Sequence, residues 1–354
     1  MGFQGFGNIG DEAILTGIEA ALRGLDGRVV TVFSGPRPEE VAAFPDAQRL
    51  VTARHLPTLS AFRALRRVDL LLLAGGGIFN DHWTGVVPRY AAWVVAARLA
   101  GARVAWIGVG VGPLRRWWTR ALARLAARVS TLVLVRDPGS AALLGAAGHP
   151  QVVPDPALFN PLRPAPSATS ATSQVGFILR APATGDRARQ AALVEGISDA
   201  IASAAARELD PIILTMGAEV DAPFVEEVHA SLARRELAGV RTESLGPTPA
   251  AALDRIGGLD GLISVRLHGL LLGAMAGVPT VPIAYDEKVR AAADLLAIGD
   301  LVVPLADVGR VDLLAHLEEA GSVVRRDALQ ERIVELRSRS ADVGAMIVTI
   351  GGRM

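Results

Sequence analysis

The stretch SVRLHGLLLGAMAGVPTVPIAYDEKVR, residues 264–290, predicts a short strand, a small-residue helix, a second strand and a polar loop. Arg266 and His268 stand two residues apart at the end of the first strand, which places both side chains on one face. The apolar run 270–276 predicts a helix that starts beside His268 and ends at Gly277. A guanidinium, an imidazole and a helix N-terminus therefore meet at one spot, a combination that favours anion binding.

The second strand of this stretch, 280–284, ends in a loop that is a further candidate for ligand contact. The loop contains Tyr285, Asp286, Glu287 and Lys288. In open α/β sheets, ligands bind at the carboxyl ends of strands. Lys288 is the only lysine among the 36 lysine and arginine residues of the chain. A lysine kept in a chain that otherwise uses arginine favours a need for its side chain in this loop, and an accidental surface position is the alternative.

The composition favours a globular protein of two domains. With 354 residues the chain is long for one hydrophobic core, and 51% of it is apolar. The formal net charge of zero gives no general attraction to nucleic acid. The absence of cysteine excludes disulfides and thiolate metal sites and suits the cytoplasm. We find neither a run of about 18 apolar residues, as a membrane span needs, nor a signal peptide ahead of the first motif.

Strand and helix patterns alternate in both halves of the chain and predict an α/β fold. The expected strands outside the opening stretch include 29–34, 50–53, 69–74, 104–109, 131–135, 175–179, 211–216 and 301–304, and the expected helices include 13–25, 90–100, 188–208, 223–237 and 328–348. Residues 163–174, RPAPSATSATSQ, show no periodicity and predict a linker. We therefore expect Rossmann-like domains at 1–162 and 175–325, and a C-terminal helix in 326–354 that packs back on the first domain.

Two glycine-rich loops in the first domain are candidate ligand sites. Gly5, Gly7 and Gly10 match G-x-G-x-x-G, but no strand precedes them, so we assign no nicotinamide or flavin site. Since a domain of this kind should begin with a strand, we expect that first strand to be missing. The second loop, GGGIFND at 75–81, follows a continuous apolar strand, and its glycines let a backbone or a ligand approach closely. A purely structural turn is the alternative at both loops.

The segment 114–129 also has two interpretations. Arg116, Arg120, Arg124 and Arg128 recur every four residues, with Trp117 and Trp118 nearby. Such a stripe most often marks a solvated helix face. An arginine stripe beside tryptophan also suits a membrane surface, and weak binding to anionic vesicles would favour that interpretation.

Six motifs occur in a fixed order along the chain: GFGNIGDEAIL (5–15), GGGIFND (75–81), GVGVGP (108–113), VRD (135–137), DPAL (155–158) and VRLHGLLLGAMAGVPTVPIAYDEKV (265–289). Together they resemble the polysaccharide pyruvyl transferase family and cover both halves of the chain. The resemblance implies a GT-B-like fold, in which two Rossmann-like domains face a cleft. It also implies transfer of pyruvate from phosphoenolpyruvate to two hydroxyls of a cell-wall or exopolysaccharide sugar, forming a ketal.

The resemblance assigns the donor site to the second domain. Arg266, Leu267 (through its backbone) and His268 would bind the donor, and His268 would protonate it. Arg180, which ends the first strand of this domain, would pair with donor charge. Phosphoenolpyruvate carries a carboxylate and a phosphate, so it needs several cations, and Lys288 supplies another at a strand end. A charged histidine suits protonation of the methylene carbon, and bound anions would hold it in that form. The alternative is that Arg266 and His268 only satisfy buried strand ends.

The acceptor side is assigned to the first domain, with the candidates Gly7, Asn8, Asp11, Gly76, Gly77 and Asp81. Asp11 or Asp81 would orient or deprotonate a sugar hydroxyl. Asp137 and Asp155 also follow strands, where helix caps and ligand contacts look alike in sequence. No metal-binding pattern is present, so we expect no metal and no cofactor besides phosphoenolpyruvate as co-substrate. We expect a cytoplasmic enzyme with a glycan acceptor that a lipid can carry, no nucleic acid partner, and a peripheral contact to the inner face of the membrane through 114–129.

Two other functions stay open. A GT-B glycosyltransferase or a sugar-nucleotide epimerase shares the two-domain plan, but it predicts an acidic residue that holds a ribose, and no strong candidate follows Tyr285. A non-catalytic protein that binds sugars or anions is the third possibility. The acceptor sugar, its hydroxyl pair and the oligomeric state are not encoded in any motif that we recognise.

Overall fold

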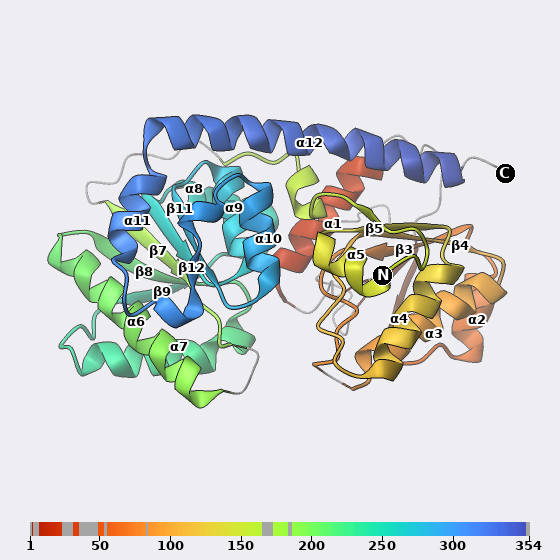
Figure 1. The fold of residues 1–354 in the computed structure, drawn as a ribbon, viewed down its shortest axis with the longest axis horizontal. Helices are drawn as coiled ribbons and strands as arrows, with labels where there is room; N and C mark the ends of the chain where they lie inside the picture. The colour runs from red at the N-terminus through yellow and green to blue at the C-terminus, as the bar shows by residue number, and fades with distance from the viewer. Residues whose placement is uncertain are drawn as a thin grey trace. The chain divides into compact units, whose positions relative to one another are not determined.

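The computed structural model describes residues 2, 7–22, 31–34, 49–52, 55–82, 84–164, 173–182 and 186–351. It is an α/β protein in which every paired strand runs parallel to its neighbour, which confirms the predicted class. The chain divides into two compact units (Figure 1). Unit 1 comprises Met1–Pro161 and Leu336–Met354, and unit 2 comprises Leu162–Glu335. Of the linker predicted at 163–174, residues 165–172 lie outside the described residues.

Unit 1 is built on a four-stranded sheet in chain order, β3 (Leu70–Ala74), β4 (Arg103–Val109), β5 (Leu132–Val135) and β6 (Gln151–Val152). A separate pair is formed by β1 (Thr31–Ser34) and β2 (Arg49–Thr52). The helices are α1 (Ile9–Leu22), α2 (Leu59–Leu65), α3 (Val86–Leu99), α4 (Trp117–Val129), α5 (Pro138–Leu144) and the 3-10 turn η2 (Pro156–Phe159). Their apolar sequences explain the core: Trp106 of β4 is fully buried and stacks on Phe79, with ring centroids 4.6 Å apart.

Helix α1 packs against η2 through a glycine. A Cβ atom on Gly17 would overlap the backbone carbonyl oxygen of Pro156. Backbone atoms of a short turn cannot swing aside as the end of a long side chain can. The close approach of α1 to the DPAL motif therefore depends on Gly17 having no side chain.

Replacing Gly17 by alanine should lower the free energy of unfolding by about 1–3 kcal/mol, because the added methyl overpacks a rigid contact. Alanine is the better helix former by about 1 kcal/mol, so propensity alone predicts the opposite sign. Urea unfolding followed by circular dichroism measures the change. Gly85→Ala is the matched control, because a Cβ atom there meets nothing within 4 Å. Equal effects at both positions would contradict the packing argument.

Unit 2 is a six-stranded sheet in the order β12-β11-β10-β7-β8-β9. Its strands are β7 (Gln174–Ile178), β8 (Asp210–Thr215), β9 (Arg241–Ser244), β10 (Gly261–Ser264), β11 (Thr280–Ala284) and β12 (Val303–Pro304). Its helices are α6 (Arg187–Ala206), α7 (Ala218–Ala233), α8 (Pro249–Gly257), α9 (Leu267–Ala276), α10 (Glu287–Leu295) and α11 (Leu313–Ala320), with the 3-10 turns η3 (Gly299–Leu301) and η4 (Leu305–Asp307). The strand order reverses between β7 and β10, and such a reversal is where open α/β sheets bind ligands.

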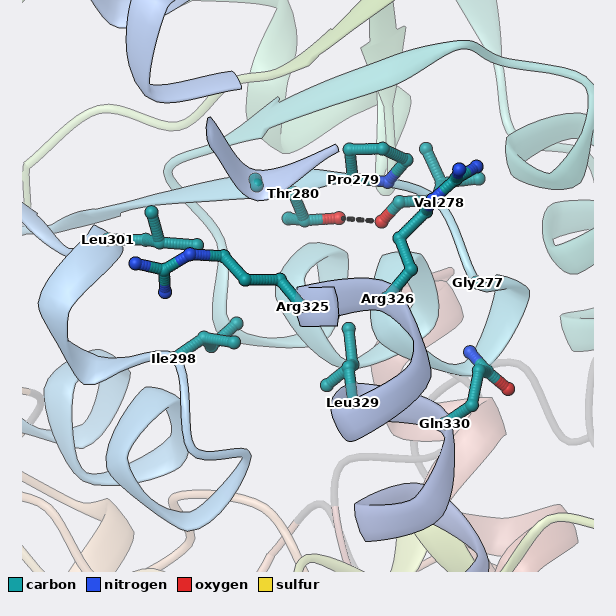
Figure 2. Close-up of a pocket in the computed structure, with 11 residues that line it drawn as sticks. Gly277, Val278, Pro279, Thr280, Ile298, Leu301, Arg325, Arg326, Leu329 and Gln330 are labelled. Carbon is teal, nitrogen blue, oxygen red and sulfur yellow. Dashed lines mark hydrogen bonds between the residues drawn. The ribbon is translucent and has the colours of Figure 1, made fainter. Parts of the chain in front are cut away.

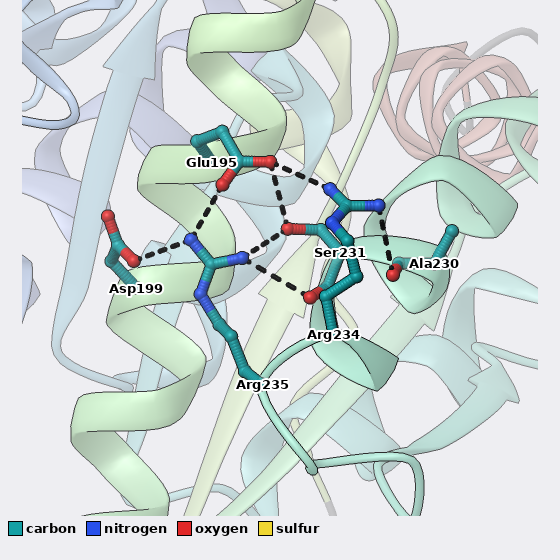
Figure 3. Close-up of polar contacts among 6 residues, drawn as sticks. All are labelled: Glu195, Asp199, Ala230, Ser231, Arg234 and Arg235. Atoms are coloured by element: carbon teal, nitrogen blue, oxygen red, sulfur yellow. Dashed lines mark hydrogen bonds and ion pairs between the residues drawn. The ribbon is translucent and has the colours of Figure 1, made fainter.

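Ion pairs join α6 to the two arginines that directly follow α7 (Figure 3). Arg235 lies 2.7 Å from a carboxylate oxygen of Glu195 and 2.8 Å from one of Asp199. Arg234 shares Glu195 at 3.0 Å. The hydrogen bond from Arg235, opposed by some burial, lowers the pKa of the Glu195 carboxyl. Because these groups are partly solvated, each pair contributes about 1 kcal/mol or less.

Helix boundaries differ from the predictions at three informative places. The strand expected to carry Arg266 and His268 ends at Ser264, and α9 already begins at Leu267. Helix α7 begins at Ala218 and contains Pro223 in its interior, although Pro223 was the predicted start. The final helix, α12 (Val323–Gly351), is longer at both ends than the predicted 328–348, and its part from Leu336 onward belongs to unit 1. Elements with weak periodicity, among them α8 and β9, were not predicted.

Candidate active site

Two of the predicted cationic residues follow the two strands at the reversal of unit 2. Ile178 of β7 pairs in register with Ser264 of β10, and the amide of Val265 donates to the carbonyl of Ile178 at 2.9 Å. Arg180 and Arg266 each stand two residues beyond these paired positions. The fold therefore brings both arginines to the carboxyl edge of the sheet, at the place where ligands bind in this class.

A serine turn sets the start of α9. The Ser264 hydroxyl donates to the carbonyl of Arg266 at 2.9 Å and accepts from the amide of the same residue at 3.2 Å. A Cβ atom on Gly269 would overlap this hydroxyl, so α9 lies close against the strand end. Arg266 thus becomes the N-cap of α9, and its side chain makes no capping hydrogen bond to the helix in the described structure. His268 lies in the first turn, half-buried, where backbone amides face forward and favour an anion.

Arg266 is paired with a buried acid that the sequence did not reveal. The guanidinium lies 2.5 Å from Oδ1 of Asp221, in the first turns of α7, and the other carboxylate oxygen of Asp221 accepts the amides of Met216 and Gly217 at 3.1 Å. Arg266 is 6% exposed and Asp221 is 1% exposed. The positive charge that we assigned to donor binding is therefore compensated within the protein, and its main geometric effect is to fix the turn before His268.

Arg180 and Lys288 both lie near the ring of Tyr285. The guanidinium carbon of Arg180 lies 6.0 Å from the ring centroid of Tyr285, and Nζ of Lys288 lies 4.9 Å from it. Asp286 caps α10 by accepting the amide of Lys288, and its carboxylate lies 3.4 Å from the ammonium. Arg180 has no ion pair with any residue that the structure describes. The predicted residues Arg180 and Lys288 are thus one cationic group around Tyr285.

In unit 1, the carboxyl ends of the strands gather four of the sequence motifs around Arg136. Its side chain is 8% exposed and lies 3.4 Å from Asp137 and 3.5 Å from Asp155. Gly110 of the GVGVGP motif makes room for it, because a Cβ atom there would lie 2.7 Å from the guanidinium carbon. A Cβ atom on Gly77 would lie 3.8 Å from one of its nitrogens. Arg136 therefore links motifs that are far apart in the sequence.

The two acids beside Arg136 also cap helices. Asp137 accepts the amide of Ser140 at 2.7 Å at the start of α5, and Asp155 accepts the amide of Ala157 at 3.0 Å at the start of η2. Sequence alone could not separate a cap from a ligand contact at these positions. In the structure each of the two carboxylates caps a helix and also lies near the Arg136 guanidinium.

The N-terminal loop of unit 1 contacts the GGGIFND loop. The Asn8 side chain caps the start of α1 by accepting the amide of Gly10 at 3.2 Å, and it donates to Asp11 at 2.7 Å. A Cβ atom on Gly76 would lie 3.3 Å from the other carboxylate oxygen of Asp11. Gly7 has a φ of 70°, which suits glycine, and residues 3–6, including Gly5, lie outside the described residues. Asn8, Asp11 and Gly76 are therefore neighbours, as a shared acceptor site requires.

The sequence model of the family described as polysaccharide pyruvyl transferase matches residues 8–287, which is most of the chain. The matched range includes the candidate site residues of both units except Gly7 and Lys288. The chain belongs to the polysaccharide pyruvyl transferase family. It is therefore a transferase of polysaccharide biosynthesis whose acceptor is a glycan. No curated protein sequence matches the chain.

Solved structures share the fold of this family member. A Listeria monocytogenes protein described as a UDP-N-acetylglucosamine 2-epimerase has a TM-score of 0.63 at 12% identity, with 100% of this chain and 97% of that chain covered. ADP-heptose lipopolysaccharide heptosyltransferase II of E. coli gives 0.52 at 13% identity, covering 93% and 98%. The O-GlcNAc transferase of Thermobaculum terrenum gives 0.55 at 15% identity, covering 98% and 65%. At these identities the likeness shows the fold alone, and it confirms the predicted GT-B-like class.

Asp81, one of the two predicted acids of the acceptor side, is already engaged. One of its carboxylate oxygens accepts the amides of Arg115 at 2.5 Å and Arg116 at 2.9 Å, and the hydroxyl of Thr119 at 3.3 Å. Burial raises the pKa of Asp81, but these donors together lower that pKa below its ordinary value. A carboxylate held in this way is a weak base, so Asp11 is the better candidate for contact with a hydroxyl.

Unit 2 also contains a small pocket (Figure 2). It is lined at the end of α9 and the start of β11, by residues that include Gly277, Pro279, Ile298, Leu301 and Arg325. Its volume of about 10 Å³ holds about one water molecule. It also lies at the amino ends of the strands, opposite the edge that carries Arg180 and His268. This pocket is too small for a sugar or for phosphoenolpyruvate.

Proposed function

We propose that the chain transfers pyruvate from phosphoenolpyruvate to two hydroxyls of one sugar in its glycan acceptor and forms a ketal. The observation that carries this proposal is the arrangement at the β7–β10 reversal. Two cations, Arg180 and Lys288, lie near the ring of Tyr285, and His268 stands in the first turn of α9. A donor with a carboxylate and a phosphate needs such a set of cations and helix amides.

Each donor residue has a distinct proposed role. Arg180 and Lys288 bind the two anionic groups of the donor, because neither is buried and both lie at the carboxyl edge. The amides of Leu267 and His268 add the partial positive charge of a helix N-terminus. Arg266, whose charge is paired with Asp221, holds the turn that presents these groups.

The proposed chemistry begins at His268. Its imidazolium donates a proton to the methylene carbon of phosphoenolpyruvate, and C2 becomes cationic. One sugar hydroxyl adds to C2, the bond from C2 to the phosphate oxygen breaks, and phosphate leaves. A second hydroxyl then adds to C2 and closes the ketal. Of the two protons released by the hydroxyls, one restores His268 and the other leaves on phosphate, so the exchange balances.

On the acceptor side we propose that Asn8 and Asp11 contact the sugar hydroxyls, together with the backbone at Gly7, Gly76 and Gly77. Asp81 holds the loop instead. The donor brings its own leaving group, so we propose that the reaction needs no metal and no bound cofactor. Because phosphoenolpyruvate is a metabolite of the cytoplasm, we place the reaction there. No helix in the described part of the chain is long and apolar enough to cross a membrane.

The direct test uses phosphoenolpyruvate labelled in its pyruvyl carbons and a panel of cell-wall glycan intermediates. We expect label in the glycan, an added pyruvate ketal by mass spectrometry, and free phosphate. Parallel reactions receive UDP- or ADP-sugars, since the structural neighbours include proteins named for such substrates. Sugar transfer or epimerisation from a nucleotide sugar, with no reaction of phosphoenolpyruvate, would replace the proposal by its alternative. Binding without turnover of either donor would favour a non-catalytic protein.

Arg180→Gln and Lys288→Gln should each weaken phosphoenolpyruvate binding by about 10–100-fold, because each removes a charged hydrogen bond worth about 1.5–3 kcal/mol. Calorimetric titration of each variant with phosphoenolpyruvate measures the affinity. Arg189→Gln is the matched control, since that side chain is 66% exposed and pairs with Asp186. An unchanged affinity in both site variants would remove Tyr285 and its two cations from the donor site.

A further inference from the structure

The positive charge of the chain is segregated although the net charge is zero. Residues 55–130 contain eleven arginines and two aspartates, Asp69 and Asp81, and no lysine or glutamate, which gives 11 − 2 = +9. The rest of the chain carries the balancing negative charge. Within 55–130, helices α2, α3 and α4 lie side by side in unit 1 (Figure 1). Helix α4 and the two residues before it carry five of these arginines and no acidic residue.

The arginines of α4 are not neutralised by neighbouring carboxylates. Arg120 donates to the carbonyl of Leu114 at 3.0 Å, and Arg124 donates to the carbonyl of Leu143 at 3.0 Å. Neither these two nor Arg128 forms an ion pair with a residue that the structure describes. By contrast, several exposed or partly exposed arginines of unit 2 form ion pairs with aspartate or glutamate, among them Arg207, Arg234, Arg235, Arg241 and Arg325. An ordinary solvated face mixes both signs of charge, and α4 does not.

The same exposed side of α4 carries apolar side chains. Trp117 is 80% exposed and Leu125 is 44% exposed. They stand eight residues apart, and Arg124 and Arg128 are seven and eleven residues after Trp117, so these positions share one helical face. The opposite face, with Thr119, Ala123, Ala126 and Ala127, is buried against the unit. A bare tryptophan among uncompensated arginines is costly in water and suits the boundary of a bilayer.

We propose that the exposed face of α4 docks on an anionic lipid bilayer. The arginines attract the acidic headgroups, and Trp117 and Leu125 enter the interface between headgroups and acyl chains. A nucleic acid or an acidic polymer would satisfy the charges, but it would leave Leu125 without an apolar environment. The bilayer is the partner that matches both the charge and the apolar residues.

If the proposed function holds, the position of α4 next to the acceptor loop explains why this face would bind a bilayer. Asp81, the last residue of the GGGIFND motif, accepts the amides of Arg115 and Arg116 directly before α4. The helix therefore begins at the loop assigned to the acceptor. A glycan whose lipid carrier stays in the bilayer would meet unit 1 at the same surface.

Sedimentation with vesicles tests the proposal without any assay of turnover. We expect the full chain to bind vesicles of phosphatidylcholine and phosphatidylglycerol in equal parts at low salt, and to bind pure phosphatidylcholine far less. Arg120→Gln with Arg124→Gln should weaken binding about 30-fold, since each arginine near an anionic surface contributes about 1 kcal/mol. Arg187→Gln with Arg189→Gln on α6 removes the same charge and should change binding less than about threefold. Circular dichroism verifies that all variants are folded.

Trp117→Ala separates a bilayer from other polyanions. It should weaken vesicle binding several-fold although it leaves the net charge of the chain unchanged. The tryptophan fluorescence of the wild-type chain should move to shorter wavelength when vesicles are added. The proposal is overturned if the wild-type chain does not bind the anionic vesicles, if both double variants lose binding equally, or if the chain binds heparin or nucleic acid but not the vesicles. Failure of the pyruvyl transfer assay would leave a positive vesicle result intact, so the two failures are distinguishable.

Discussion

His268→Ala should lower the rate of pyruvyl transfer by about 100-fold or more while the chain still binds phosphoenolpyruvate. The imidazole belongs to the first turn of α9, which follows the N-cap residue Arg266. A donor anion would lie there against the helix amides. Protonation of a carbon atom is slow without a positioned acid, so loss of this group acts mainly on the chemical step. Labelled phosphoenolpyruvate measures the rate, and calorimetric titration measures the affinity.

The control for this variant is another histidine of unit 2. His229 on α7 is hydrogen-bonded to Thr242 at 2.8 Å, away from the carboxyl edge, and His229→Ala should retain the wild-type rate. A rate for His268→Ala within about threefold of wild type would assign the proton transfer to another group. Loss of donor binding along with turnover would instead make His268 a binding residue.

Asp221→Asn should lower the free energy of unfolding by about 3–5 kcal/mol, because it leaves the Arg266 guanidinium charged and buried without its acid. Asp221 and Arg266 are 1% and 6% exposed, so water cannot replace the lost partner. The change retains the volume of the side chain, and the effect therefore reports charge rather than a cavity. Chemical unfolding followed by circular dichroism measures it.

Two further variants test this interpretation. Asp199→Asn removes one acid from the partly solvated pair with Arg235 and should cost about 1 kcal/mol or less. Asp221→Asn combined with Arg266→Met should cost less than the sum of the two single changes, because the buried charge is then gone. Strict additivity would mean that the two side chains do not interact in solution.

Much of the fold could be predicted because its signals are local. Continuous apolar runs such as β3 and β4 mark strands buried on both faces, and the periodicity of α6 marks a helix. The motifs from 5–15 to 265–289 predicted the family, and the family model that matches residues 8–287 confirms that prediction. The prediction that a helix starts close to His268 also holds, although α9 begins three residues earlier than expected.

The sequence by itself determined the α/β class, the family and the residue types of the candidate donor site, since these depend on short segments and their order. Only the tertiary structure decided which side chains meet. Asp221 reaches Arg266 across 45 residues, Arg180 reaches the ring of Tyr285, and Asp81 turns to the start of α4. These contacts follow from the strand order of each sheet and the close packing that it imposes, and no local pattern encodes that order. The charge that looked free on Arg266 was neutralised by this packing, while the charges on α4 were left exposed.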